Sequence, residues 1–233
     1  WMKRLLWGIL IFILYPLADK HIAVSNGVAK AMSKYGRIKL SKISIIPNPV
    51  INEIMFQQSS VFVYHRFFKT NEPILLYVGR LSYEKDIPNI INAFSKVQEQ
   101  VKSRLLIIGD GPDKNKLEEL VIKSNISNRV SFLGHQENPY PFFLKSDLFL
   151  LSSTREGLPT VLIEALAFGL KIVSTDCQSG PREILDNGKY GKLVEQSNSF
   201  ALAESMISSL EGPSTVIPEK FFDKYKVESA VYL

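Results

Sequence analysis

The residues of this 233-residue chain best suited to binding a charged ligand include two cations, Arg80 and Lys85, in the segment GRLSYEK. Arginine presents a planar fork of donors and lysine a compact charge, so the pair can straddle a diphosphate. The segment begins at Gly79, which lets the backbone approach a ligand closely. The structural alternative is that both cations are solvated loop residues with Glu84 as their partner.

Two carboxylates, Glu156 and Glu164, are separated by seven residues in the segment EGLPTVLIEALAFG. Glu164 is the only charge within VLIEALAF, and a carboxylate among apolar neighbours is costly unless it is paired or hydrogen-bonded. A pair of sugar hydroxyls would satisfy it bidentately, and an ion pair with Arg155 or Arg182 is the structural alternative. Glu156 precedes the predicted helix, so one carboxylate is expected on a loop and one inside the helix.

Both ends of the helix predicted over residues 159–168 are marked by residues typical of helix ends. Pro159 fits the first helical position, and Gly169 fits the cap at the carboxyl end. Proline donates no hydrogen bond, but the amides of Thr160 and Val161 remain available and, together with the helix dipole, favour an anion. The sequence therefore predicts a phosphate site at the start of this helix, beside both carboxylates.

Three further loops carry weaker signals. The segment GDGP (109–112) is half of a dinucleotide fingerprint, but Lys114 stands where the full motif requires glycine, so a tight turn is favoured over NAD binding. His135 in FLGH follows a strand end and is a weak candidate for contacting a base ring. In SGPRE, Gly180 would let the backbone approach a ligand, and Glu183 is best explained as a cap in the first turn of a helix.

The elements that must position these residues follow a regular pattern after residue 72. Short continuous apolar strands such as ILLYV, RLLII and DLFLL alternate with helices, which is typical of a parallel sheet covered on both faces. We predict an α/β fold, a doubly wound Rossmann-like domain over residues 72–195. In such sheets ligands bind beyond the carboxyl ends of the strands, where the segments above lie.

Composition and charge exclude several classes of protein. The chain is 45% hydrophobic and 22% charged, which excludes a disordered, collagen-like or disulfide-rich protein. A net charge of +5 suits phosphate ligands or an anionic membrane surface but is too weak to indicate nucleic acid. The single cysteine, Cys177, allows neither an internal disulfide nor a cysteine metal site, and it favours the cytoplasm. Without an Asp-x-Asp pair or a histidine cluster, neither a tightly bound metal nor a cofactor is expected.

The amino-terminal end has an unusual composition. Because Trp1 precedes Met2, we interpret the chain as a piece of a longer protein. Residues 5–18 form an almost unbroken apolar run, shorter than the ~18 to 20 residues of a membrane-spanning helix and without a small-x-small cleavage site after it. The favoured interpretation is a helix that a missing domain would bury; a membrane-surface anchor and a targeting segment are the other two.

Several motifs occurring in one order make the chain resemble a known family. The segments GRLSYEK, IIGDGP, FLGH and EGLPTVLIEALAFG resemble the donor-binding half of family 4 glycosyltransferases of the GT-B fold. The resemblance covers roughly residues 19–233, because ADKHIAVS and IPNP are similar to the end of that family's first domain and its linker. It implies a remnant of the first domain at 1–46, a linker at 47–71, and helices at 196–233 that cross back to the first domain.

The resemblance implies a retaining, metal-independent transfer of a sugar from a nucleotide diphosphate, a UDP-linked hexose or N-acetylhexosamine, to a glycan or lipid-linked acceptor in bacterial surface polysaccharide synthesis. By that similarity Arg80 and Lys85 neutralise the diphosphate, and Glu164 binds the ribose hydroxyls. Glu156 binds the hydroxyls of the donated sugar and forms the catalytic set with the two cations. The remaining donor-binding positions are Gly79, Gly134, His135, Gly157, Leu158, Thr160 and Val161. The implied location is cytoplasmic, with peripheral contact to the membrane.

The sequence departs from the family pattern in two short segments and in extent. Asp86 stands where the family has glycine after the lysine, and Pro49 where the linker reads Pro-Asn-Gly. Nearly all of the first domain, which carries the acceptor site, is absent from the chain. Two other functions therefore stay open: a non-catalytic module that binds a nucleotide sugar, and a sugar-nucleotide epimerase.

Overall fold

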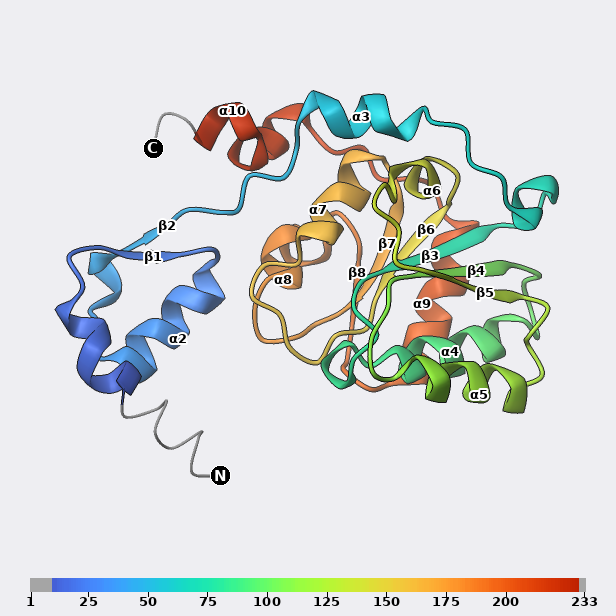
Figure 1. Cartoon of the computed structure of the whole chain (residues 1–233), viewed down its shortest axis with the longest axis horizontal. Coiled ribbons are helices and arrows are strands. Elements are labelled where there is room, and N and C mark those ends of the chain that lie inside the picture. Colours follow the sequence, from blue (N-terminus) through green and yellow to red (C-terminus); the bar gives the residue numbers. More distant parts are fainter. Residues whose placement is uncertain (1–9, 231–233) are drawn as a thin grey trace.

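The computed structural model describes residues 10–230, with side chains described as far as residue 228. Its main feature is a six-stranded, wholly parallel sheet with the strand order β5-β4-β3-β6-β7-β8 (Figure 1). Counted from β3, this is the order 3-2-1-4-5-6 of a doubly wound sheet. The predicted fold class is therefore confirmed. The strands are β3 (Ile74–Val78), β4 (Arg104–Ile108), β5 (Val130–Gly134), β6 (Leu148–Leu151), β7 (Lys171–Thr175) and β8 (Lys192–Val194).

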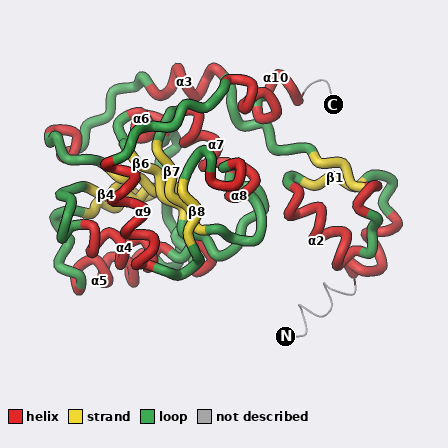
Figure 2. Tube along the Cα trace, turned by 180° about the vertical axis from the view of Figure 1, so that it is seen from behind, coloured by secondary structure: helices red, strands yellow, loops and turns green. Residues whose placement is uncertain are grey.

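Helices cover both faces of this sheet (Figure 2). The side chains of each strand alternate between the two faces: Leu75 and Tyr77 of β3 belong to one hydrophobic core, and Ile74 and Leu76 to the other. Because both faces are buried, the strands read as continuous apolar runs. The first core is covered by α4 (Ile87–Val97), α5 (Lys114–Lys123) and α9 (Ser199–Glu211), and the second by α3 (Glu53–Ser59), α6 (Tyr140–Leu144), α7 (Thr160–Ala167) and α8 (Pro181–Ile184).

The last strand of the sheet lies close to the end of the predicted domain. Strand β8 pairs with the far edge of β7. Within 196–233, α9 packs against α4 and lies on the sheet, whereas Tyr225 bonds to the segment that leads into the sheet domain: its carbonyl accepts from the amides of Val50 and Ile51, at 2.8 and 2.9 Å. The last turns are a 3-10 segment, η6 (Glu219–Tyr225), and α10 (Val227–Ala230).

The amino-terminal part forms a separate small unit (Figure 1). Strands β1 (His21–Ala23) and β2 (Ile43–Ile45) pair in parallel, and α2 (Asn26–Gly36) connects them over a small core that includes Ala29 and Ile38. Residues 47–71 run from this unit along the sheet domain and contain α3 and the 3-10 turn η3 (Arg66–Lys69).

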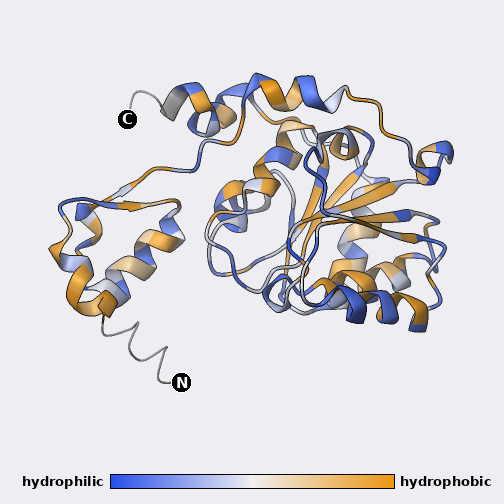
Figure 3. Cartoon of the chain, in the orientation of Figure 1, coloured by the Kyte–Doolittle hydropathy of each residue, from blue (hydrophilic) through white to orange (hydrophobic). Residues whose placement is uncertain are grey.

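The part of the apolar run that the structure describes is exposed. Figure 3 colours most of this segment as hydrophobic, and among its side chains Leu17 is 74% exposed. Residues 5–9 of the run, and residues 231–233 of the predicted crossing segment, lie outside the described residues. Among the helices of residues 10–230, none is long and apolar enough to cross a bilayer.

Candidate functional site

The point at which the strand order reverses lies between β3 and β6, which are neighbours in the sheet. The loop 79–86 follows β3, and the loop 152–159 follows β6. In a doubly wound sheet the connections on the two sides of this point turn to opposite faces and leave a crevice beyond the strand ends. The topology therefore brings the predicted cation loop and the predicted carboxylate loop to one place.

Lys85 and Glu156 form an ion pair across this reversal point. The Lys85 Nζ lies 2.6 Å from Glu156 Oε1, and the two side chains are only 22% and 10% exposed. The Ser153 hydroxyl donates to the same oxygen, also at 2.6 Å. Lys85 thus pairs with Glu156 and not with Glu84, the partner suggested by the structural alternative. An ammonium has three donors, so Lys85 retains donors for a ligand.

The backbone around this ion pair is held by further hydrogen bonds. The Ser152 hydroxyl donates to the Lys85 carbonyl at 2.5 Å, and the Thr154 amide donates to the Glu84 carbonyl at 2.9 Å. On the other side, the Ser179 hydroxyl donates to the Glu156 carbonyl at 2.8 Å. Hydrogen bonds therefore link the loop after β6 to the loops after β3 and β7.

Arg80 lies at the mouth of the same loop, and its side chain is exposed. Within the described residues its guanidinium makes no ion pair or hydrogen bond. Its position is fixed by the backbone instead, because the buried Tyr77 hydroxyl donates to the Arg80 carbonyl at 3.0 Å. Burial, together with the negative charges of Glu156 and Glu84, raises the pKa of Tyr77, so this donor stays protonated.

Asp86, the departure from the family pattern, has a left-handed backbone with φ of 44°. Glycine adopts this conformation without strain, whereas most other residues do not, and Asp tolerates it better than a branched residue. The Asp86 carboxylate accepts a hydrogen bond from the Ser197 hydroxyl at 2.7 Å. The loop therefore keeps, with aspartate, the turn for which a glycine is suited.

The helix that carries Glu164 begins one residue later than predicted. Pro159 is the residue before α7, in an extended conformation, and Thr160 is the first helical residue. Thr160 and Val161 have no acceptor within the helix for their amides, so the predicted donors are present at its start. At the other end, Gly169 has φ of 75°, and its amide and that of Leu170 bond back to Leu166 and Ala165, which confirms the predicted cap.

Glu164 is mostly buried near the start of α7. Burial raises the pKa of its carboxyl from 4.5 to about 7. Within the described residues the carboxylate has no hydrogen bond or ion pair, and the predicted structural alternative is not found, because Arg182 pairs with Asp176. The pKa of Tyr140 is raised mainly by burial and also by the negative charge of Glu164. Among the side chains of residues 10–228, Glu164 is therefore a carboxylate without a partner.

The loops after β4 and β5 pack backbone against backbone. The Gly109 amide donates to the Gly134 carbonyl at 2.8 Å, and the Leu81 amide donates to the Asp110 carbonyl at 2.9 Å. A Cβ on Gly109 would lie 1.9 Å from the carbonyl oxygen of Gly79. The glycines of GDGP thus admit the neighbouring loop, which agrees with the expected tight turn. His135 follows Gly134 and is exposed.

The small amino-terminal unit contacts the sheet domain beside Glu156. The Ser25 hydroxyl donates to the Gly157 carbonyl at 2.8 Å. The carboxylate of Glu183 accepts from both the amide and the side chain of Asn26, each at 2.9 Å. The sequence predicted that Glu183 caps its own helix. Instead its carboxylate caps α2 of the other unit, because Asn26, the first residue of α2, lies against it. The signal in the sequence was the pair Ser25 and Asn26, because serine and asparagine favour helix starts. It could have suggested that this helix start has a partner such as Glu183.

The acidic, histidine and cysteine side chains do not gather into a metal-binding group in the part of the chain that the structure describes. Among residues 10–230 no group of three or more His, Cys, Asp or Glu side chains could hold a metal ion. Cys177 is buried, and burial raises the pKa of its thiol to about 11, so it is held as a neutral thiol.

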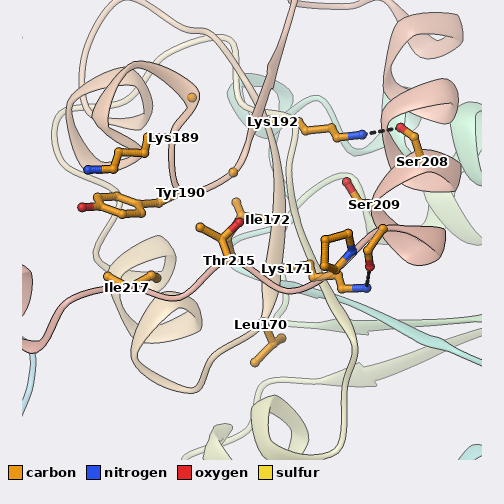
Figure 4. A pocket seen from close by; sticks show the side chains of 14 residues that line it. Leu170, Lys171, Ile172, Lys189, Tyr190, Lys192, Ser208, Ser209, Thr215 and Ile217 are labelled. Atoms are coloured by element: carbon orange, nitrogen blue, oxygen red, sulfur yellow. Dashed lines mark hydrogen bonds between the residues drawn. The ribbon is translucent and has the colours of Figure 1, made fainter.

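A cavity of about 310 Å³ lies away from this site, between β7, β8 and the end of α9 (Figure 4). Three lysines line it, and all three have partners: the Lys189 Nζ lies 3.7 Å from an Asp186 carboxylate oxygen. The Lys171 Nζ donates to the Gly212 carbonyl at 2.6 Å, and Lys192 donates to the Ser208 hydroxyl. Cations at this place complement the carboxyl end of α9. The cavity therefore has a structural explanation.

Two site residues were missed in the sequence. Ser153 holds the Glu156 carboxylate, and Ser179 holds the Glu156 backbone. For Ser153 the available signal was the pair of serines directly after the apolar strand LFLL, because buried hydroxyls need a hydrogen-bond partner. Leu158, predicted to bind the donor, packs on the second hydrophobic core and is half-buried.

A family model for glycosyl transferases group 1 matches residues 61–224, more than half of the chain. The chain belongs to the group 1 glycosyl transferases. This confirms the family resemblance that the sequence motifs suggested.

Two relatives of this group 1 glycosyl transferase have assigned activities. The N-acetylgalactosamine-N,N'-diacetylbacillosaminyl-diphospho-undecaprenol 4-alpha-N-acetylgalactosaminyltransferase of Campylobacter jejuni is 31% identical over 202 residues, 87% of this chain and 53% of the relative. The lipopolysaccharide 1,6-galactosyltransferase of Escherichia coli is 32% identical over 209 residues, covering 87% and 55%. The chain thus spans about half the length of these relatives.

The fold of the chain is similar to that of solved glycosyltransferases. The structure of Anabaena Alr3699/HepE in complex with UDP and glucose matches with a TM-score of 0.74 at 21% identity, covering 87% of this chain and 56% of that one. At this identity the likeness establishes the fold.

Proposed function

We propose that the protein containing this chain is a glycosyltransferase of bacterial surface polysaccharide synthesis that takes its sugar from a UDP-linked hexose or N-acetylhexosamine. The observation that carries the proposal is the Lys85–Glu156 pair at the strand-order reversal, with the unpartnered Glu164 in the adjacent helix. The family and the printed activities of the Campylobacter and Escherichia relatives support the reaction class. UDP and glucose in the Anabaena structure support the donor.

Each charged residue then has a role toward the donor. Arg80 and the free donors of Lys85 neutralise the diphosphate, which is why the proposed transfer needs no metal ion. The amides of Thr160 and Val161 bind a phosphate, and Glu164 accepts hydrogen bonds from the two ribose hydroxyls. Glu156 accepts from hydroxyls of the donated sugar, and the backbone near Gly134 and His135 meets the base.

The proposed reaction breaks the bond between the anomeric carbon of the sugar and the diphosphate oxygen, and it forms a bond from that carbon to the acceptor oxygen with retention of configuration. The acceptor hydroxyl loses its proton, and UDP departs. Negative charge develops on the departing diphosphate, so the two cations stabilise the transition state more than the bound donor.

The proposed location is the cytoplasmic face of the membrane, with peripheral contact. The support is the exposed apolar surface of residues 10–17, where the Arg37 guanidinium lies over the Phe12 ring and Lys39 and Lys42 follow along the chain. Apolar side chains flanked by cations favour an anionic interface.

The test is incubation of the full-length protein with each of four labelled donors (UDP-glucose, UDP-galactose, UDP-GlcNAc and UDP-GalNAc) and a polyprenyl-diphosphate-linked glycan. Transfer of label with an α linkage supports the proposal. Donor binding without transfer would support the non-catalytic module instead, and product formed from the donor without acceptor would support an epimerase.

A further inference from the structure

Two consecutive buried serines follow β6, and their hydroxyls bond to the two members of the central ion pair. Ser152 and Ser153 are both fully buried. The Ser152 hydroxyl donates to the carbonyl of Lys85 at 2.5 Å, and the Ser153 hydroxyl donates to Glu156 Oε1 at 2.6 Å. Each serine thus acts on a different charged residue.

These hydrogen bonds change what the ion pair can offer a ligand. An ion pair between a lysine and a carboxylate alone does not fix which carboxylate oxygen accepts from the ammonium. Here the Lys85 ammonium and the Ser153 hydroxyl converge on one oxygen, Oε1, and Glu156 Oε2 has no partner within the described residues. A carboxylate held at one oxygen has the other available to accept from a hydroxyl.

The serines are themselves held rigidly. The Thr175 hydroxyl, at the end of the neighbouring strand β7, donates to the Ser153 carbonyl at 2.6 Å, and Thr175 is fully buried. Side chains locked by packing and by a second set of hydrogen bonds position a site more closely than loop residues do.

We propose that Ser152 and Ser153 are positioning residues with separate tasks: Ser153 orients Glu156 toward the donated sugar, and Ser152 orients Lys85 toward the diphosphate. This inference rests on the proposed function of the site. It goes beyond the donor-binding set, because neither serine is required to touch the donor.

The test compares binding of UMP, UDP and the preferred UDP-sugar to the full-length protein by calorimetry. Ser153→Ala should reduce the affinity gained from the sugar, the ratio of the UDP and UDP-sugar dissociation constants, about tenfold, while UDP binding stays unchanged. Ser152→Ala should reduce the affinity gained from the second phosphate, the ratio for UMP and UDP, by about three- to tenfold.

The matched control is Ser174→Ala. Ser174 is equally buried at the end of β7, but its hydroxyl donates only to the Thr175 carbonyl at 3.0 Å. Both ratios should stay at their wild-type values in this variant. If Ser153→Ala does not fold, Ser153→Cys retains most of the volume with a weaker donor, and it should change the sugar ratio in the same direction.

Unchanged ratios in both serine variants, with normal donor binding by the wild type, would overturn the inference and leave the proposed function intact. Equal losses of UMP, UDP and UDP-sugar affinity, matched by Ser174→Ala, would also overturn it, because they indicate a general packing role. If the wild type binds no nucleotide, the proposed function itself fails, and this inference fails with it.

Discussion

Lys85 and Glu156 are 71 residues apart in sequence, and the ammonium of one lies 2.6 Å from the carboxylate of the other at the strand-order reversal. Each residue lies in a loop from a different half of the doubly wound sheet. The fold therefore places the proposed cation for the diphosphate directly beside the proposed acceptor for the sugar.

Removing either cation should slow transfer without unfolding the protein. We expect Lys85→Ala and Arg80→Ala each to lower kcat/KM on the order of 10² to 10³-fold, the scale for losing a group that stabilises developing charge. Steady-state kinetics with the preferred donor measure this. Lys116→Ala is the control, because Lys116 is a lysine of α5 whose side chain is 82% exposed. Near-normal turnover in both site variants would rule out the diphosphate role.

Glu164 should make donor binding release protons. Its pKa is raised to about 7 in the free protein, and ribose hydroxyls stabilise the charged carboxylate, so binding should lower that pKa. UDP binding near pH 6 should then release close to one proton, and affinity should rise with pH up to about 7. Calorimetry in buffers of different ionisation enthalpy measures the release. Glu164→Gln should bind UDP more weakly and release no proton from this residue; an equal release would contradict the assignment.

The same carboxyl should make stability depend on pH. Its pKa in the folded state, about 7, lies above the unfolded value of 4.5, so the folded state binds more protons and loses stability as pH rises between these values. The free energy of unfolding of Glu164→Gln should therefore rise relative to that of the wild type as pH increases over this window. Above pH 7 the relative gain should be on the order of 3 kcal/mol. Denaturant unfolding at a series of pH values tests this. A difference independent of pH would refute it.

The left-handed turn at Asp86 should tolerate only certain side chains. Asp86→Asn should fold with nearly unchanged stability, since asparagine visits this conformation readily. Asp86→Val should lower the free energy of unfolding by about 1 to 2 kcal/mol more, because a branched side chain is strained at a φ of 44°. Thermal and denaturant unfolding compare the two, and equal stabilities would show that the turn relaxes.

The sequence predicts the sheet well because apolar strands alternating with helices are a local pattern. The same pattern predicts a site beyond the strand ends, and the candidate residues Lys85 and Glu156 meet there. The contacts that the sequence does not predict join distant segments. Glu183 has an ordinary local role as a helix cap, but its true partner, Asn26, lies 157 residues away. Ser153 lacks any motif, and only the strand packing shows that it reaches Glu156.

The start of α7 illustrates the limit of local signals. Pro159 suits the first helical position, but the ring lies against Gly180, where a Cβ would come within 2.4 Å of the Pro159 Cδ. Pro159 is extended, and the helix begins at Thr160. The close approach of Gly180 is a contact that no local signal in the sequence indicates.

Gly109 should be intolerant of any side chain. Gly109→Ala would place a Cβ 1.9 Å from the Gly79 carbonyl oxygen, so we expect a loss of unfolding free energy of more than about 2 kcal/mol. Gly188→Ala is the control, because Gly188 also has a positive φ but open space around its Cα, and only backbone strain of about 1 kcal/mol applies. Similar losses in both variants would show that the neighbouring loop yields.

The contact between Gly109 and Gly79 limits which substitutions the two loops can accept during evolution. The Gly-x-Gly pattern here leaves room for another piece of the same chain and not for a cofactor. A side chain could enter position 109 only if the loop that carries Arg80 moved at the same time. The two loops, 30 residues apart, must therefore change together. We expect a destabilising substitution in one loop to be compensated more readily by a second substitution in the other loop than by one beside it.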